Sequence, residues 1–351
     1  MTVSVIICDD SNMARKQLAR CLPKEWEVSI DFAENGLQAL DLMHDGLGDI
    51  LFLDLTMPEL DGFGTLAEIK KQCITVDVIV VSGDIQEEAR RRVMELGALD
   101  FIRKPSTPDQ IEKVLLDHKL YKLAPKAALN VSKNPEESKS STVKTAKKDS
   151  LSLADQAEIF DCYQEITNVA MGRAGDLLAR LTGEFVSLPI PKVAMLEASE
   201  LLMALAFADD DSVSAVCQGF ISRGIAGEAL LLFSDSSFAN MAELMKQPGE
   251  LESVQIEVLT DLSSALLGAI LNGLGEQLDL SFSQGYPTVL GRHSSISNLI
   301  SANTGKWTKT LTIEVTYVIE SHDIICDVLL LFTAESMASI NSRLSYVLSD
   351  E

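Results

Sequence analysis

Basic residues are scarce in this chain of 351 amino acids, which has 29 lysines and arginines, 52 aspartates and glutamates and a net charge of −23. Binding of nucleic acid or of an anionic membrane requires clustered lysine and arginine, so this acidity argues against both partners. The six cysteines stand singly, with no Cys-x-x-Cys pair, which indicates neither a zinc site nor a disulfide framework. No apolar run approaches the roughly 18 to 20 residues of a membrane span, and no signal peptide precedes the first strand. We therefore expect a cytoplasmic protein without membrane insertion.

The charge is distributed unevenly and divides the chain into three parts. Residues 1–120 and 151–351 carry net charges of −9 and −18, whereas residues 121–150 carry +4. The basic stretch is rich in lysine and serine and almost free of large apolar residues, which is typical of a disordered tether. A chain of this length suits two domains. We expect folded domains at 1–120 and 151–351, joined by a disordered linker at 121–150.

Apolar segments alternate with helical patterns through the first domain. Ile50–Leu53 is wholly apolar and is bounded by acids, as expected of a strand buried on both faces in the middle of a parallel sheet. Five such strand–helix units predict a flavodoxin-like α/β fold, a doubly wound sheet of five parallel strands. The other strands are expected at Val3–Cys8, Val28–Phe32, Asp77–Val81 and Asp100–Ile102, and the helices from Ser11 and at Gly36–Met43, Gly62–Gln72, Gln86–Leu96 and Pro108–Leu120.

Polar side chains follow four of these strands at their carboxyl ends. Asp9 and Asp10 follow the first strand, Asp54 the third, Ser82 the fourth and Lys104 the fifth. The carboxyl ends of parallel strands meet at one rim, where open α/β sheets bind their ligands. Three carboxylates there require a hard cation such as Mg²⁺, and an ammonium and a hydroxyl beside it suit a transferred phosphoryl group. Asp54 is then the nucleophile that accepts the phosphoryl group.

Two other interpretations of Asp54 compete with this one. An isolated Asp before Met57-Pro58 is often no more than the end of a strand and the start of a turn. A haloacid-dehalogenase phosphatase also uses an aspartyl nucleophile, but it requires a second Asp two residues later, where this chain has Thr56. The other polar residues at the strand ends favour the phosphoryl-transfer site over both.

These residues resemble the response regulator receiver domain, the family of the chemotaxis regulator CheY. The resemblance extends over the whole of residues 1–120 and rests on several motifs at receiver spacing. They are Asp9-Asp10, Asp54 with Met57-Pro58 and Asp61-Gly62 after it, Ser82-Gly83 and Phe101-Ile-Arg-Lys-Pro105.

The resemblance implies a role for each site residue and a partner for the domain. A histidine kinase would supply the phosphoryl group to Asp54. Phe101, which replaces the commoner Tyr and lacks its hydroxyl, would report phosphorylation by changing rotamer. Ser82 and Lys104 would contact the phosphoryl group, and Mg²⁺ would be held by Asp9, Asp10, Asp54 and the backbone carbonyl of Thr56.

The second domain begins with a helical pattern that carries two notable polar residues. Glu165 and Asn168 are three residues apart and therefore share one helix face, while Ile166 and Val169 turn inward. Pro191 follows Asn168 by 23 residues. An exposed polar helix face would be the better explanation of this pair if it stood alone.

The same spacing recurs 96 residues later, which indicates an internal duplication. Asp261 stands where Glu165 would be repeated, Ser264 stands for Asn168, and Pro287 again follows by 23 residues. Each half ends in a strand with the sequence Leu-Leu-Leu-Phe. We expect a pseudo-symmetric α+β domain in which a long antiparallel sheet carries the paired helices.

This pattern resembles the CheC/CheX/FliY phosphatases of bacterial chemotaxis over about residues 153–350. Asp161, Glu165, Asn168 and Pro191 satisfy the family motif. The resemblance implies that Asn168 orients a water against a phospho-aspartate and that Glu165 engages the active-site lysine of the receiver. The second pair, Asp261 and Ser264, departs from the motif and is expected to be a degenerate site.

The fusion leaves the target of this phosphatase open. A separate CheY-type receiver is the usual target of the family, and the acidity of both domains disfavours docking between them. The tether favours the chain's own Asp54, because it gives a high effective concentration. A third alternative is a non-catalytic docking module. In each case, phosphorylation is expected to change the receiver surface near Ser82 and Phe101 and thereby to control the second domain.

Overall fold

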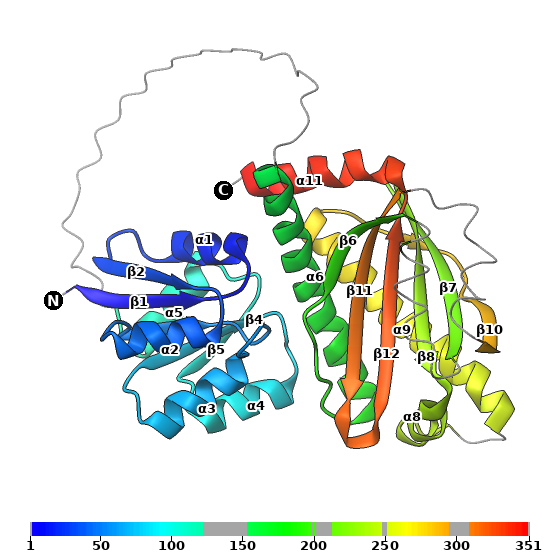
Figure 1. The fold of residues 1–351 in the computed structure, drawn as a ribbon, viewed down its shortest axis with the longest axis horizontal. Helices are drawn as coiled ribbons and strands as arrows, with labels where there is room; N and C mark the ends of the chain where they lie inside the picture. The colour runs from blue at the N-terminus through cyan, green and yellow to red at the C-terminus, as the bar shows by residue number, and fades with distance from the viewer. Residues whose placement is uncertain are drawn as a thin grey trace, which may run out of the picture.

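The computed structural model describes residues 2–121, 153–197, 200, 213–247, 251–294 and 309–349. These residues form two sheets, each with its own helices, and the long helix α6 (Leu153–Thr182) lies between them (Figure 1). Apart from its first residue, the expected linker at 121–150 lies outside the described residues.

The first domain is built on the expected sheet of five parallel strands. The strand order is β2-β1-β3-β4-β5, so the chain reverses its winding direction after β2. All four residues of the central strand β3 are buried, as its apolar sequence predicts. The strands are β1 (Val3–Cys8), β2 (Val28–Ala33), β3 (Ile50–Leu53), β4 (Asp77–Ser82) and β5 (Asp100–Arg103).

Five helices cover the two faces of this sheet, and their ends follow local sequence signals. Ser11, Asn35, Asp61 and Thr107 cap the N-termini of four helices with their side chains. The last helix ends earlier than its sequence predicts, at Asp117. The helices are α1 (Asn12–Cys21), α2 (Gly36–His44), α3 (Gly62–Gln72), α4 (Glu87–Leu96) and α5 (Pro108–Asp117).

The first domain has a hydrophobic interior of its own on each face of the sheet. One cluster, which includes Leu53 and Val80, lies on the face covered by α2, α3 and α4. The other, which includes Phe52 and Ile111, lies against α1 and α5. Among the described residues, Phe185 is the single side chain of the second domain that joins either cluster, and it is only partly buried there. The first domain therefore has the core of an independent folding unit.

The second domain contains an antiparallel sheet of seven strands packed against α6 and α9 (Leu251–Leu278). The sheet order is β10-β7-β8-β12-β11-β6, with β9 paired to β7. The strands are β6 (Lys192–Glu197), β7 (Val213–Ser222), β8 (Ile225–Ser234), β9 (Ser283–Gln284), β10 (Thr288–Ser294), β11 (Lys309–Ile319) and β12 (Ile324–Phe332), and the shorter helices are α8 (Phe238–Leu244) and α11 (Met337–Ser349).

The strand order of this sheet is symmetrical about its centre. Exchanging β6, β7 and β8 for β10, β11 and β12 reproduces the same order read backwards. The two strands with the sequence Leu-Leu-Leu-Phe, β8 and β12, are the central neighbours, and Leu230 pairs with Leu329. Each is the second strand of an antiparallel hairpin. This arrangement agrees with the antiparallel sheet expected from the repeated sequence.

Helix α9 contains one segment, Val254–Leu278, that is long and apolar enough to cross a membrane by length and composition. This apolar run is longer than any that the sequence pattern predicted. More than half of the segment is buried inside the protein, where Leu262, Leu266 and Ile270 pack between the sheet and α6. The hydrophobicity of α9 is therefore that of a core helix.

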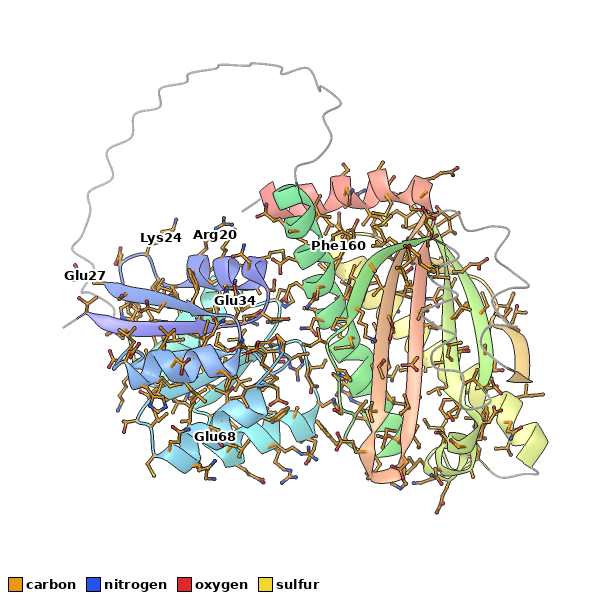
Figure 2. The ribbon with its side chains drawn as sticks, viewed as in Figure 1. Arg20, Lys24, Glu27, Glu34, Glu68 and Phe160 are labelled. Atoms are coloured by element: carbon orange, nitrogen blue, oxygen red, sulfur yellow. The ribbon has the colours of Figure 1, made fainter. Side chains whose placement is uncertain are left out.

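Side chains from both domains fill the space between α6 and the first sheet (Figure 2). The partly buried side chain of Met13 in α1 packs against the hydrophobic core of the second domain. Lys16 of α1 forms an exposed ion pair with Glu158 of α6, at 3.6 Å. The two acidic domains thus dock in the structure, although their net charges favour separation. The local contacts at the first domain's rim explain this difference.

Candidate functional site

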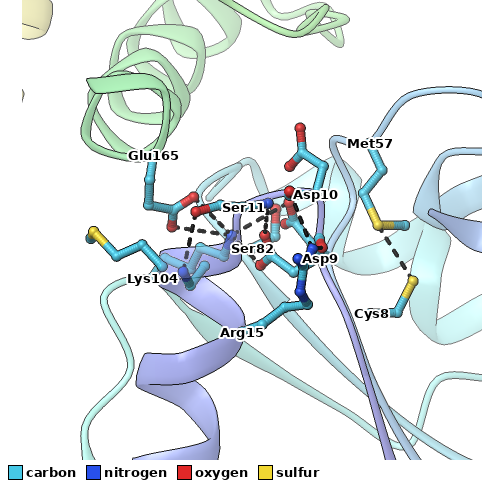
Figure 3. Close-up of polar contacts among 12 residues, drawn as sticks. Cys8, Asp9, Asp10, Ser11, Arg15, Met57, Ser82, Lys104 and Glu165 are labelled. Carbon is cyan, nitrogen blue, oxygen red and sulfur yellow. Dashed lines mark hydrogen bonds and ion pairs between the residues drawn. The ribbon is translucent and has the colours of Figure 1, made fainter. Parts of the chain in front are cut away.

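The polar residues at the ends of β1, β3 and β5 meet at one rim of the first sheet, as their positions predict. Lys104 Nζ lies 2.7 Å from Asp9 Oδ2 and 3.4 Å from Asp54 Oδ2 (Figure 3). The other oxygen of Asp9 accepts a hydrogen bond from the Ser11 backbone N–H at 3.0 Å. The guanidinium of Arg15 donates to the Asp9 carbonyl at 2.6 Å, which fixes the backbone beneath the carboxylates.

Asp54 is the most deeply buried carboxylate of the rim, with 1% of its surface exposed. Neither of its side-chain oxygens accepts a hydrogen bond, although Lys104 lies within ion-pair distance. Burial raises the pKa of Asp54 well above its usual range, and the neighbouring carboxylates of Asp9 and Glu165 add to the effect, while Lys104 opposes it. A buried carboxylate that has no hydrogen-bond donor and shares one ammonium with other carboxylates is a site for a metal cation or a covalent partner.

The donor chemistry of the rim fits a hard divalent cation. Asp9, Asp10 and Asp54 each offer a carboxylate oxygen, and these oxygens all lie within 4.8 Å of one another. Burial and the charge of Asp9 raise the pKa of Asp10 to about 6, which a nearby cation would reverse. Oxygen ligands from two or three carboxylates are those that Mg²⁺ takes in proteins. These three residues are the ones that would hold it.

Helix α6 of the second domain closes over this rim and brings Glu165 to Lys104. The Glu165 carboxylate lies 3.2 Å from Lys104 Nζ, and both side chains are buried. Burial alone would lower the pKa of Lys104, but Asp54, Asp9 and Glu165 outweigh it and raise that pKa. Burial also raises the pKa of Glu165 to about 7, against the opposing effect of Lys104. The ammonium of Lys104 is thus shared among three carboxylates from both domains.

Two further side chains of α6 contact the rim residues directly. The Asp161 carboxylate accepts hydrogen bonds from the backbone N–H groups of Asn12 and Met13, at 3.2 and 2.8 Å. Those groups belong to the first turn of α1, where a helix favours an anion. Gln164 donates to Asp10 Oδ2 at 3.0 Å. The first residue of the CheC-like motif is therefore a docking contact, and Gln164 is a contact that the motif did not indicate.

Asn168 lies beside the loop that follows β4, next to Ser82. A Cβ atom on Gly83 would lie 3.0 Å from the Asn168 carbonyl oxygen and 3.2 Å from Val169 Cα. One turn later, a Cβ atom on Gly172 would lie 1.9 Å from the Gly83 carbonyl oxygen. The backbones of α6 and of the β4–α4 loop are therefore in direct contact. Position 172 has no room for a side chain, and a side chain at position 83 would crowd α6.

A second contact between the domains lies at the start of α4, away from the carboxylates. The side-chain amide of Gln86 donates to the Val186 carbonyl at 2.7 Å and accepts from the Val186 N–H at 2.9 Å. The ring of Phe185 lies 4.0 Å below the Arg92 guanidinium and 6.5 Å from the ring of Phe63. Nothing in the sequence pattern indicated Gln86, because it recognises main-chain atoms.

The remaining expected residues take several positions. Ser82 is buried at the end of β4, and its hydroxyl accepts from the Asp84 N–H at 3.2 Å. Thr56 is half-buried and lines an interdomain cleft of about 670 Å³. Phe101 is half-buried against the core of the first domain. The roles expected for these three stay predictions.

The degenerate second pair lies on the surface of α9. Asp261 and Ser264 are both exposed, and Asp261 accepts a hydrogen bond from Gln247 at 3.3 Å. Within the described ranges, neither forms a hydrogen bond or an ion pair with the first domain. The structure therefore brings together Glu165 and Asn168 with the rim, and leaves the second pair apart from it.

Comparison with known proteins identifies the first domain. Residues 5–116 match the model of the family "Response regulator receiver domain". The chemotaxis protein CheY of Halobacterium salinarum is 33% identical over 119 residues, which are 33% of this chain and 98% of that protein. A protein-glutamate methylesterase/protein-glutamine glutaminase of Treponema denticola is 35% identical over 124 residues, and the chain spans 33% of its length.

Among solved structures, the CheX–CheY–BeF3–Mg complex of Borrelia burgdorferi contains a chain that is 29% identical, with a TM-score of 0.31. The match covers 33% of this chain and 89% of that one. The family match does not extend into the second domain. The first domain matches the family model and covers 98% of a CheY protein, so this chain belongs to the response regulator receiver domain family.

Proposed function

We propose that this protein is a cytoplasmic two-component regulator that is phosphorylated on Asp54 and carries its own phosphatase. In this proposal a histidine kinase supplies the phosphoryl group, and the second domain, a CheC-like domain, removes it. The observation that carries the proposal is the ion pair of 3.2 Å between Glu165 and Lys104, which joins the phosphatase motif to the phosphoryl-transfer site of the same chain.

The positions of the rim residues support phosphorylation at Asp54. Its carboxylate has no hydrogen-bond donor, so it is available as a nucleophile. Lys104 and Ser82 lie at the ends of the neighbouring strands, where an ammonium and a hydroxyl can contact the equatorial oxygens of a phosphoryl group. Mg²⁺ bound to Asp9, Asp10 and Asp54, with the Thr56 carbonyl, would neutralise the charge that develops on those oxygens.

The hydrolysis then requires a water molecule and a residue that orients it. The water oxygen forms a bond to phosphorus as the bond between phosphorus and the Asp54 oxygen breaks. Asp54 leaves as a carboxylate with the electron pair of that bond, and both protons of the water leave with the inorganic phosphate. Asn168 orients the water through its carboxamide, which does not titrate, and Glu165 holds Lys104 in place.

The surroundings of Glu165 include a small cavity beside Lys104. The cavity bounded by Lys104, Glu165 and Val169 has a volume of about 50 Å³, and Asp9 also lines it. Neither Asp54 nor Asn168 is among its lining residues. The cavity therefore gives the Glu165–Lys104 pair space beside the rim and does not mark the position of the attacking water.

The lifetime of phospho-Asp54 in the full-length chain tests the proposal. The protein would be phosphorylated with acetyl phosphate, freed of excess donor and followed by phosphate release. The Glu165→Ala/Asn168→Ala variant should lengthen the lifetime on the order of tenfold or more, because it loses positioning of both water and lysine. An equal lifetime in wild type and variant would contradict the proposal.

Two alternatives give different outcomes in the same assay. A separate CheY-type receiver, the target favoured by the sequence, would be indicated if added phospho-CheY lost phosphate faster while phospho-Asp54 did not. A non-catalytic docking module would accelerate neither reaction and would give only saturable binding. The contact of Glu165 with Lys104 of its own chain favours the reaction within one chain over both.

A further inference from the structure

The chemistry of the rim cannot by itself tell one receiver from another. Any receiver that accepts a phosphoryl group in this way needs acids and a lysine like Asp9, Asp54 and Lys104. A phosphatase that recognises these residues alone would act on every receiver it meets. Discrimination must come from contacts at positions that phosphoryl transfer leaves free to vary.

The loop that carries Gly83 packs closely against α6. A Cβ atom on Gly83 would lie 3.0 Å from the Asn168 carbonyl oxygen and 3.2 Å from Val169 Cα, both main-chain atoms of a helix. Gly83 belongs to the Ser82-Gly83 motif that this chain shares with the receiver family, so this contact fits the loop to α6 without separating one receiver from another.

A position outside the shared motifs is Gln86, which binds the main chain of Val186 with both ends of its amide. The two hydrogen bonds, of 2.7 and 2.9 Å, are buried, since Gln86 is 1% exposed and Val186 is fully buried. A residue without a primary amide at position 86 would leave the N–H and C=O groups of Val186 buried without partners. That loss is expensive because water cannot replace the amide.

We propose that Gln86 is the specificity-determining residue by which the second domain recognises its own receiver. It selects receivers with a primary amide four residues after the phosphoryl-contacting serine. The inference rests on the proposed function, because it names the substrate of that phosphatase as a receiver with this feature.

A trans assay separates recognition from catalysis. The enzyme is the full-length Asp54→Ala chain, and the substrate is the isolated phospho-receiver, residues 1–121, which has its own core and the extent of a single-domain relative. On the substrate, Gln86→Ala should raise KM about tenfold and leave kcat unchanged, since two buried hydrogen bonds are lost. Gln86 does not cap α4 with its side chain, so the substitution leaves the capping of α4 unchanged.

The same substitution on the enzyme should have the opposite effect. The enzyme's own receiver competes for the docking surface, so Gln86→Ala there releases that surface and lowers KM for the added substrate. Substitution of the neighbouring exposed residue, Glu87→Ala, is the matched control and should change neither value. A merely structural role of Gln86 would not reverse sign between the two chains, and equal effects on both would overturn the proposal.

Amide hydrogen exchange tests the recognition without any catalysis. The Met13 N–H donates to Asp161 only when the domains are docked, and it lies in the first turn of α1, where it has no partner within the helix. In full-length Gln86→Ala it should exchange about tenfold faster than in wild type. An unchanged rate would overturn the inference even if hydrolysis is confirmed, whereas faster exchange without hydrolysis would overturn the proposed function alone.

Discussion

The substitution Gly172→Ala should open the two domains and at the same time stabilise the second one. The added Cβ atom at this position would lie 1.9 Å from the Gly83 carbonyl oxygen and 3.0 Å from the Asp84 nitrogen. Ordinary van der Waals contact begins at 3.4 Å, so α6 must retreat by about 1.5 Å to reach it. That retreat takes Glu165 out of ion-pair range of Lys104 and breaks the hydrogen bonds at the start of α4.

The magnitudes of the two effects can be estimated separately. Alanine in the interior of a helix is favoured over glycine by about 0.5–1 kcal/mol, so the melting temperature of the second domain should rise by roughly 1–4 °C. Loss of docking removes several buried hydrogen bonds, each contributing about 1 kcal/mol. The phospho-Asp54 lifetime should therefore lengthen to that of Glu165→Ala/Asn168→Ala.

A matched control is available on the other long helix. A Cβ atom on Gly268 of α9 meets nothing closer than 3.8 Å, so Gly268→Ala should give the same helix stabilisation without any change in docking. Calorimetry, small-angle scattering and phosphate release on the three proteins complete the assay. If Gly172→Ala kept both the scattering radius and the phospho-Asp54 lifetime of wild type, the glycine contact would not control docking and the reasoning would be refuted.

Three further predictions concern pH, metal and core packing. Burial raises the pKa of Asp84 to about 6, so burying its charged form costs free energy of folding above pH 6 and costs nothing below pH 4. At neutral pH, Asp84→Asn should therefore raise the free energy of unfolding by about 3 kcal/mol. In denaturant titrations near pH 4, the variant and the wild type should be equally stable. Chelation of Mg²⁺ should abolish labelling of Asp54 by acetyl phosphate, and added Mg²⁺ should restore it; labelling that survives chelation would contradict the metal assignment. Tyr163→Phe, which removes the hydrogen bond of 2.6 Å to Asn341, should lower the unfolding free energy of the second domain by about 1–2 kcal/mol and leave the phospho-Asp54 lifetime unchanged.

The sequence predicted the first domain well because chemistry and fold are coupled there. Asp9, Asp54 and Lys104 each stand directly after an apolar strand, and a parallel sheet brings all strand ends to one rim. The position of each residue in the chain therefore also determines its position in space. For the second domain, the repeated spacing and the strands that end in Leu-Leu-Leu-Phe indicated the antiparallel sheet in the same way.

The sequence left the docking of the two domains open, because the tether favoured it and the net charge did not. Net charge argued against it, but long-range repulsion is screened, whereas the ammonium of Lys104 lies among three carboxylates at close range. The contacts of Gln86 with Val186 and of Gly172 with Gly83 involve main-chain atoms, and such contacts leave no pattern of residue types. The net charge of a domain describes its whole surface, and it does not predict which atoms form the contacts between two domains.

The position of α6 over its own rim has a consequence for the duration of a signal. If the proposed hydrolysis takes place within one chain, the decay of the phosphorylated state is first-order. Its half-life would then be set by how often α6 docks, and it would not change with the amount of protein in the cell. A kinase would have to reach Asp54 while α6 is away, so the same motion would let the signal start and determine when it ends.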